Sequence, residues 1–270
     1  MIRGVIFDLD GTIYRGEALL PGAREALTAL RLAGIRRVFL SNKPLERPSA
    51  YAAKLTRLGI PTTEAEVINS SRVLAAYLRR AMPAARLLVV GEPPLKEELA
   101  EAGLVIVEDS PAVDCVVLAF DRTFDYRKLN LAFQAAKFHG ARLVATNADR
   151  SCPVDGGEIP DAAGMIAAVE ATTGRKVELV AGKPSPLVVE AALDRLGVRP
   201  EEALMVGDRL ETDIAMGRAA GLKTALVLSG VTARRDLEVS AHQPDYVWES
   251  VAELPAALGL EAAGREREEA

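Results

Sequence analysis

Apolar, strand-like stretches alternate with amphipathic, helix-like stretches along almost the whole chain, and this alternation limits the fold more than any other feature. Residues 5–9 and 37–41 are rich in β-branched, aromatic and aliphatic side chains and are predicted to be buried strands. Between them, the apolar spacing of residues 22–33 predicts a helix that Gly34 ends. Strands joined by helices pair in parallel, so this order predicts an α/β fold with a parallel sheet covered on both faces.

The same alternation continues toward the end of the chain. Further strands are predicted at 86–90, 104–107, 113–119, 142–146, 177–180, 203–206, 223–228 and 245–248, with helices at 48–58, 69–80, 126–138, 186–196 and 212–220. A length of 270 residues allows two moderate domains, and Pro83 and residues 180–182 are reasonable limits for an inserted one. Residues 261–270 are dominated by alanine and charged side chains and are predicted to be disordered.

The composition excludes several classes of protein. Hydrophobic residues make up 49% of the chain, enough for a sizeable core, and a net charge of −5 without a basic block argues against nucleic acid or an acidic membrane as partner. Cys115 and Cys152 are too few for a disulfide framework, and His139 and His242 lie outside every motif. Neither a charged-then-apolar leader nor an apolar run of about 18 residues is visible, so we expect a cytoplasmic protein.

The first predicted strand ends in two aspartates, Asp8 and Asp10, followed by Gly11 and Thr12. Residues two apart on an extended chain project to the same side, so the two carboxylates repel each other and need a cation to stay ionised together. Gly11 permits a sharp turn, and the amides that follow it can face an anion. For this motif taken alone, an ordinary Asp-Gly turn at a strand end remains the alternative.

Two more predicted strands end in residues suited to phosphate binding. The hydroxyl of Ser41 and the neighbouring amide of Asn42 can donate to phosphoryl oxygens, with a turn or helix-capping serine as the alternative. Lys183 stands between Gly182 and Pro184 and offers a compact positive charge for a phosphate dianion. A solvated surface lysine is the alternative for this tripeptide.

The strand at 203–206 leads to a further pair of aspartates, Asp208 and Asp213. With Asp8 and the Asp10 carbonyl, Asp208 would complete an oxygen cage for Mg²⁺, which prefers near-octahedral oxygen ligands. Asp213 can orient a metal-bound water, although an aspartate in the first turn of a helix is also favoured by the helix dipole. Ligands of open α/β sheets lie outside the carboxyl ends of the strands, so all four strand ends are predicted to converge on one site.

With these motifs, the chain resembles the haloacid dehalogenase-like hydrolase superfamily, and within it the NagD-like (p-nitrophenylphosphatase-type, subclass IIA) phosphatases. The resemblance runs from Ile6 to about Val231 and is carried by IFDLDGTIY at 6–14, TNAD at 146–149, GKPSP at 182–186 and VGDRLETDI at 206–214. It implies a Rossmann-like three-layer core, residues 1–81 and 179–260, with an α/β cap domain inserted at 82–178.

The resemblance also implies a Mg²⁺-dependent phosphatase that acts on small phosphomonoesters. Asp8 would attack phosphorus and form an aspartyl-phosphate, and Asp10 would serve as general acid and then as general base. Ser41, Asn42 and Lys183 would bind the phosphate. The implied Mg²⁺ ligands are Asp8, Asp10, Asp208 and Asp213.

Two positions depart from the family pattern. Lys43 stands where relatives often carry a second asparagine, and Ala148 replaces the proline of the usual T-N-P-D segment. In that segment Asn147 and Asp149 would contact substrate, with a turn role as the alternative for Asp149.

The expected partner is a small phosphorylated metabolite, and a cap-mediated homodimer is a further expectation. The same motifs also fit a phosphotransferase or mutase, or a regulatory module that binds a phosphorylated ligand without turnover.

Overall fold

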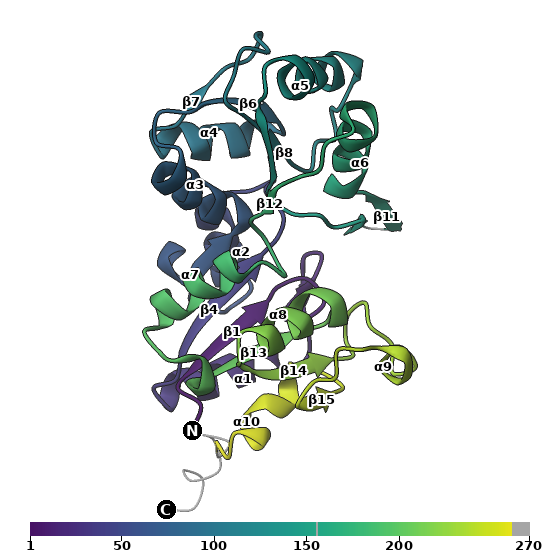
Figure 1. The fold of residues 1–270 in the computed structure, drawn as a ribbon. Coiled ribbons are helices and arrows are strands. Elements are labelled where there is room, and N and C mark those ends of the chain that lie inside the picture. The colour runs from purple at the N-terminus through teal and green to yellow at the C-terminus, as the bar shows by residue number, and fades with distance from the viewer. Residues whose placement is uncertain (155, 261–270) are drawn as a thin grey trace, which may run out of the picture. The chain divides into compact units, whose positions relative to one another are not determined.

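The computed structural model describes residues 1–154 and 156–260, which form two compact units (Figure 1). The first unit contains Met1–Leu40, Tyr51–Val67 and the chain from Val189 onward, and the second contains Ser41–Ala50 and Ile68–Val188. Each unit has its own sheet and its own cluster of buried apolar side chains. Both units are built from parallel strands and flanking helices, which confirms the predicted α/β fold class.

The sheet of the first unit brings distant parts of the sequence together. Within the described residues it has six strands in the order β15-β14-β13-β1-β4-β5. Their bounds are β1 Gly4–Asp8, β4 Arg36–Ser41, β5 Val67–Asn69, β13 Ala203–Gly207, β14 Lys223–Val227 and β15 Tyr246–Trp248. β1 pairs in parallel with both neighbours, and Gly4 lies opposite Arg36 on one side and Ala203 on the other. The carboxyl ends of β4, β1 and β13 therefore lie at the same edge of the sheet.

β1 is buried on both faces, which explains its continuous apolar sequence. Val5, Ile6 and Phe7 have 0% exposed surface, and Phe7 stacks on Phe39 with the ring centroids 5.9 Å apart. Helix α1 (Ala23–Leu32) contributes its apolar face to the same cluster. Full burial of one such side chain contributes about 1.5–3 kcal/mol to the stability of the fold. This strand is therefore a rigid support for Asp8 at its end.

The other helical segments of the first unit are mostly short. Those lying wholly or partly in it are α2 (Pro48–Arg57), η1 (Glu64–Glu66), α7 (Pro186–Leu196), η2 (Pro200–Glu202), η3 (Leu210–Ile214), α8 (Ala215–Ala219), α9 (Asp236–Val239), η4 (Val251–Glu253) and α10 (Leu254–Ala257), and β2 (Tyr14–Arg15) pairs with β3 (Ala18–Leu19). The helix predicted at 212–220 is shorter than expected and is preceded by a π-helical turn, η3. In that turn the carboxylate of Asp213 accepts the N–H of Arg209 at 3.1 Å, so a side chain organises the start of the helix.

The second unit has a separate sheet, and its described strands follow the order β12-β9-β8-β6-β7. They are β6 (Arg86–Val90), β7 (Val105–Ile106), β8 (Cys115–Leu118), β9 (Arg142–Ala145) and β12 (Leu179–Val180), with a hairpin of β10 (Ser151–Val154) and β11 (Gly157–Pro160). The helices are α3 (Ser70–Ala81), α4 (Pro93–Glu101), α5 (Tyr126–Phe138) and α6 (Ala162–Thr173). In the part of the chain that the structure describes, no helix has the length and apolar character needed to cross a membrane.

The structure also contains elements that the sequence patterns did not indicate. The predicted strand at 86–90 and helix at 126–138 are present with the same bounds, whereas α4, α6 and the β10–β11 hairpin were not predicted. α6 has the sequence AAGMIAAVEATT. Its own side chains are mostly small or apolar on every face, so the sequence shows no amphipathic period that would predict a helix. β12 pairs with β9, which places residues 179–180 in the second sheet. The domain limits at 82 and 178 remain a prediction.

Candidate active site

Three aspartates gather where β1 and β13 end. Asp8 is the last residue of β1, and Asp208 directly follows the last residue of β13. Phe7 lies opposite Val206 in the register, so the two strands finish side by side. Asp213 comes from the helical turn η3, which follows Asp208. One carboxylate oxygen of each aspartate lies within 4.8 Å of those of the other two, so the predicted cluster of Asp8, Asp208 and Asp213 exists.

The cluster is largely shielded from water. Asp208 is 1% exposed and Asp213 is 0% exposed. Burial raises the pKa of the Asp208 carboxyl, and the negative charges of Asp8 and Asp213 raise this pKa further. A nearby cation is what allows such a set of carboxylates to be ionised together at neutral pH. Oxygen ligands of this kind suit Mg²⁺, so the donor set of Asp8, Asp208 and Asp213 fits a divalent cation.

The loop after β14 holds Asp208 from the other side. The N–H of Val231 donates to Asp208 Oδ2 at 2.7 Å, and the N–H of Thr232 donates to the Asp208 carbonyl at 3.2 Å. A Cβ added to Gly230 would lie only 1.9 Å from Asp208 Oδ2, so this close approach requires glycine. The hydroxyl of Ser229 donates to the Gly11 carbonyl at 2.7 Å and ties this loop to the loop after β1.

The residues after β1 form a tight loop that fixes Asp8. The hydroxyl of the fully buried Thr12 lies 3.3 Å from Asp8 Oδ2, where it donates a hydrogen bond. Gly11 has a positive φ of 87°, and its N–H donates to the Tyr14 carbonyl at 2.8 Å. Asp10 lies in this loop, two residues beyond the end of β1, and is partly exposed. The side chain of Asp10 lies outside the three-carboxylate cluster, and its roles as proton donor and carbonyl ligand remain predictions.

Asp213 is held by the backbone that precedes it. Its Oδ2 accepts the N–H of Arg209, and a Cβ on Gly207 would lie 2.4 Å from its carboxyl carbon. Gly207 therefore makes room for the Asp213 side chain beside the end of β13. The carboxylate caps its own turn, as the alternative reading expected, and it also lies in the three-carboxylate cluster; its role toward a metal remains a prediction.

A second group of predicted residues lies in the second unit, where Asn42 contacts the backbone of Lys183. Asn42 Oδ1 accepts the N–H of Lys183 at 2.7 Å, while Asn42 Nδ2 donates to the Lys183 carbonyl at 3.2 Å and to Asp149 Oδ2 at 3.0 Å. Lys183 is 5% exposed and follows β12. Ser41, the last residue of β4, accepts the N–H of Lys43 on its hydroxyl at 3.2 Å.

The residues after β9 extend this group through buried side chains. Asn147 is 0% exposed, and its Nδ2 donates to Asp149 Oδ2 and to Asp161 Oδ1, each at 3.0 Å. Asp161 was not predicted as a site residue. Burial raises its pKa, opposed by hydrogen bonds from the Ala162 N–H and Asn147, and the positive charge of Lys43 also opposes the rise. The structure gives Asn147 and Asp149 a place in this network, and their contact with substrate remains a prediction.

The predicted site residues thus form two groups, each within one compact unit. The first unit holds the carboxylates of Asp8, Asp208 and Asp213. The second unit holds the network of Asn42, Lys183, Asn147 and Asp149. Sequence reasoning missed Ser229–Val231 in the first group: Ser229 acts through its hydroxyl, Gly230 through its small size and Val231 through its backbone N–H. Their signal is a Ser-Gly-Val-Thr segment that begins two residues after the end of β14, a strand that neighbours β13.

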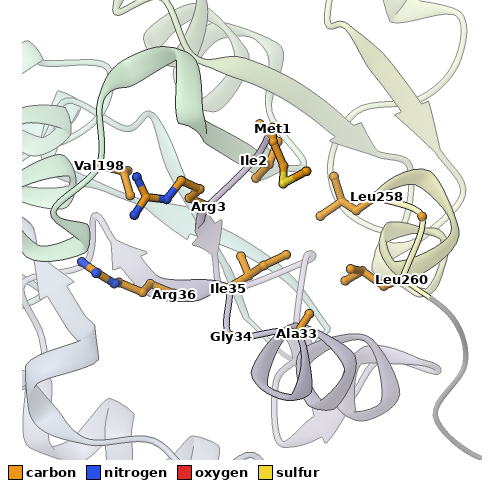
Figure 2. Close-up of a pocket in the computed structure, with 11 residues that line it drawn as sticks. Met1, Ile2, Arg3, Ala33, Gly34, Ile35, Arg36, Val198, Leu258 and Leu260 are labelled. Carbon is orange, nitrogen blue, oxygen red and sulfur yellow. The ribbon is translucent and has the colours of Figure 1, made fainter.

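A cavity in the first unit lies away from these residues. It has a volume of about 490 Å³ and lies at the amino ends of β1 and β4, where Figure 2 shows Arg3, Arg36 and Ile35 at its border with Leu258 and Leu260. Arg3 pairs with Glu202, and Arg36 donates to the Leu196 carbonyl, so both guanidinium groups have protein partners. Asp8 is at the opposite, carboxyl end of β1, and the cavity is therefore separate from the carboxylate cluster.

Comparison with protein-family models gives two matches. A model described as haloacid dehalogenase-like hydrolase matches residues 5–105, and a model described as HAD-hydrolase-like matches residues 180–254. Together they include both strands whose ends carry Asp8 and Asp208.

Several of the similar proteins are named as phosphatases. The chain is 42% identical to sugar-phosphatase AraL of Bacillus subtilis over 251 residues, which is 93% of this chain and 91% of that protein. It is 35% identical to human glycerol-3-phosphate phosphatase, over 94% of this chain and 90% of that protein. Among solved structures, 4-nitrophenylphosphatase from Thermotoga maritima superposes with a TM-score of 0.90 at 38% identity, covering 95% of this chain and 97% of its own. NagD from Escherichia coli K-12 gives 0.85 at 34% identity, covering 93% and 98%.

Proposed function

The chain belongs to the haloacid dehalogenase-like hydrolases, within the NagD-like subclass IIA phosphatases, and on that premise we propose that it hydrolyses small phosphomonoesters with Mg²⁺ through an aspartyl-phosphate on Asp8. Its relatives establish it as a phosphoric monoester hydrolase. The observation that carries the proposal is the cluster of Asp8, Asp208 and Asp213, whose carboxylate oxygens lie within 4.8 Å of one another.

Asp8 is the nucleophile in this proposal. Its carboxylate attacks phosphorus, a bond from oxygen to phosphorus forms, and the bond from phosphorus to the leaving oxygen breaks. Asp10 gives its proton to the leaving oxygen, and then takes a proton from the water that attacks the aspartyl-phosphate. This attack releases inorganic phosphate and returns Asp8 to its carboxylate form. The hydrogen bond from Thr12 supports the choice of Asp8, because it holds the attacking group at the end of a rigid strand.

Bound Mg²⁺ would neutralise the carboxylate cluster and stabilise negative charge on the transferring phosphoryl group. We assign its binding to Asp8, Asp208 and Asp213, together with the Asp10 carbonyl. The burial of Asp208 and Asp213 supports this assignment, since two buried carboxylates beside a third are costly to ionise without a cation.

We assign phosphate binding to Ser41, Asn42 and Lys183. Ser41 ends β4, the strand that pairs with β1, and its hydroxyl can donate to a phosphoryl oxygen. The backbone amide of Asn42 would donate as well, and the Lys183 ammonium would balance the charge of the dianion. The substrate class follows from the relatives, one a sugar phosphatase and one a glycerol-3-phosphate phosphatase. We therefore propose phosphate esters of sugars and small polyols.

The Asp8→Asn variant tests the nucleophile. It keeps the size and the hydrogen-bonding position of the side chain but removes the attacking carboxylate, so hydrolysis of p-nitrophenyl phosphate in Mg²⁺ falls to background while the folded structure persists. Circular dichroism and the melting temperature verify the fold. Asp114→Asn, at an exposed position of the second unit, is the matched control and keeps wild-type turnover. Turnover retained by Asp8→Asn would contradict the assignment. A panel of phosphorylated sugars and polyols then ranks the substrates by kcat/KM.

A further inference from the structure

The side chain of Asn42 makes two hydrogen bonds to the backbone of Lys183. Its Oδ1 accepts the Lys183 N–H at 2.7 Å, and its Nδ2 donates to the Lys183 carbonyl at 3.2 Å. The two residues are 141 positions apart in the sequence, so this contact joins the segment after β4 to the segment after β12. Both segments belong to the second unit.

The surrounding backbone is shaped to allow this contact. A Cβ on Gly182 would lie 2.5 Å from Asn42 Oδ1 and 2.7 Å from the Thr146 carbonyl, so the close approach requires glycine at this position. The Gly182 N–H donates to that carbonyl at 2.7 Å. On the other side, the hydroxyl of the fully buried Ser70 donates to the Asn42 carbonyl at 2.7 Å. Asn42 is therefore held at its backbone and at its side chain.

A carboxylate determines which way the Asn42 amide points. Asp149 Oδ2 accepts from Asn42 Nδ2 at 3.0 Å, and an ionised carboxylate can only accept. The Lys183 N–H can only donate, so it needs the oxygen of the amide. A flipped amide would place its nitrogen against the Lys183 N–H and its oxygen against the Asp149 carboxylate, which excludes that orientation. Asp149 is in turn held by Asn147, whose amide also donates to the buried Asp161 at the start of α6.

We propose that Asn42 is a positioning residue that sets the backbone of Lys183 for phosphate binding, and that Asp149 fixes the orientation of the Asn42 amide. This inference rests on the proposed role of Lys183. A lysine ammonium sits at the end of a flexible four-carbon stem, so its position depends on where its backbone is anchored. Asn42 anchors the Lys183 backbone through its N–H and its carbonyl. Asp149 affects phosphate binding indirectly, through its hydrogen bond to Asn42.

The experiment compares Asn42→Asp, Asp149→Asn and the double variant. Asn42→Asp keeps an acceptor for the Lys183 N–H, but loses both donated bonds and places two carboxylates together. We expect kcat/KM for p-nitrophenyl phosphate to fall by roughly 10- to 100-fold, since small misplacements of a site can have this cost. The inhibition constant of inorganic phosphate rises in parallel. Asp149→Asn keeps an acceptor oxygen and has a milder effect, and adding it to Asn42→Asp raises activity because the like-charge contact is removed.

If Asn42 and Asp149 only stabilised the fold, their variants would lower the melting temperature without changing the inhibition constant of phosphate. Asp121→Asn is the matched control, because Asp121 is another aspartate of the second unit; it is buried and pairs with Lys128 at 2.6 Å. It lowers the melting temperature but leaves the phosphate inhibition constant near the wild-type value. The Mg²⁺ activation constant stays unchanged in all these variants, since the carboxylate cluster belongs to the first unit.

Two results separate this inference from the proposed function. Lys183→Met tests the role of the lysine itself, and its loss of phosphate inhibition is expected. If Lys183→Met loses this inhibition while Asn42→Asp behaves like Asp121→Asn, the positioning role is wrong and the proposed function stands. If Lys183→Met keeps wild-type inhibition by phosphate, the phosphate-binding role of Lys183 is wrong, and the inference is overturned with it.

Discussion

Replacing Gly230 with alanine changes the carboxylate cluster without removing any of its polar groups. The new Cβ would lie 1.9 Å from Asp208 Oδ2, whereas real Cβ contacts are essentially never below 3.0 Å. Asp208 or the loop that carries Gly230 must therefore shift by about 1 Å. The position has an ordinary φ, so backbone strain does not add to the effect.

The size of the effect follows from what Asp208 loses. The Val231 N–H donates to Asp208 Oδ2 at 2.7 Å, and a hydrogen bond to a charged group contributes about 1.5–3 kcal/mol. Since about 1.4 kcal/mol corresponds to a factor of ten, we expect the Mg²⁺ activation constant to rise by roughly 10- to 100-fold. Overpacking also lowers stability by about 1–3 kcal/mol, which for a chain of this size lowers the melting temperature by about 2–4 °C per kcal/mol.

The assay measures p-nitrophenyl phosphate hydrolysis over a range of Mg²⁺ concentrations, with melting curves at the same concentrations. Gly164→Ala is the matched control, because a Cβ at Gly164 in α6 meets nothing within 4 Å. Its activation constant remains that of the wild type. A Gly230→Ala protein with the wild-type activation constant and melting temperature would refute the view that this loop fixes Asp208 for the metal.

Three further predictions follow from burial and charge. Because the pKa of Asp208 is raised in the metal-free fold, the free energy of unfolding without metal falls as pH rises through that pKa. For the same reason, Mg²⁺ binding releases a proton from Asp208. Titration calorimetry in two buffers of different ionisation enthalpy measures this proton release, and equal binding heats in the two buffers would contradict it. Leu118→Ala in the fully buried strand β8 lowers the free energy of unfolding by about 2–5 kcal/mol in urea denaturation, and a loss below 1 kcal/mol would show that this strand is not part of a packed core. Burial raises the pKa of Asp121, but hydrogen bonds from Lys128 and Thr123 outweigh it and lower this pKa overall. The ionised Asp121 therefore stabilises the fold above its unfolded pKa of about 3.9, and this stabilisation is lost as pH falls through the folded pKa. The difference in unfolding free energy between the wild type and Asp121→Asn is expected to narrow in acid, and a difference that does not change with pH would contradict this.

Several site residues could be predicted from the sequence because topology brings them together. Asp8 and Asp208 are 200 residues apart in the sequence, but they lie at the ends of strands that are adjacent in the sheet, and a parallel α/β arrangement places both at one edge. Asp213 could be predicted from its place in the first turn after that strand. For Asp8 and Asp208 the signal was a carboxylate at the end of an apolar run, and it gained weight only because several predicted strands end in this way.

Other residues could not be predicted, because their contribution is not visible in side-chain chemistry. Gly230 acts by the Cβ that it lacks, and Val231 by a backbone N–H. Asp161 caps the start of a helix that has no amphipathic period, so no sequence pattern indicates that it lies near Asn147. The contact of Asn42 with Lys183 joins two loops of the second unit, and its geometry depends on tertiary packing that no local pattern records.

If Asp8 is the nucleophile, it carries the phosphoryl group during turnover. Acid quenching of the enzyme during hydrolysis of a ³²P-labelled phosphomonoester, followed by peptide mapping, measures this directly. We expect label on the peptide that contains Asp8, present only while substrate is being turned over and absent in Asp8→Asn. Label on a different residue, or turnover without any labelled enzyme at times shorter than one catalytic cycle, would show that Asp8 is not the nucleophile.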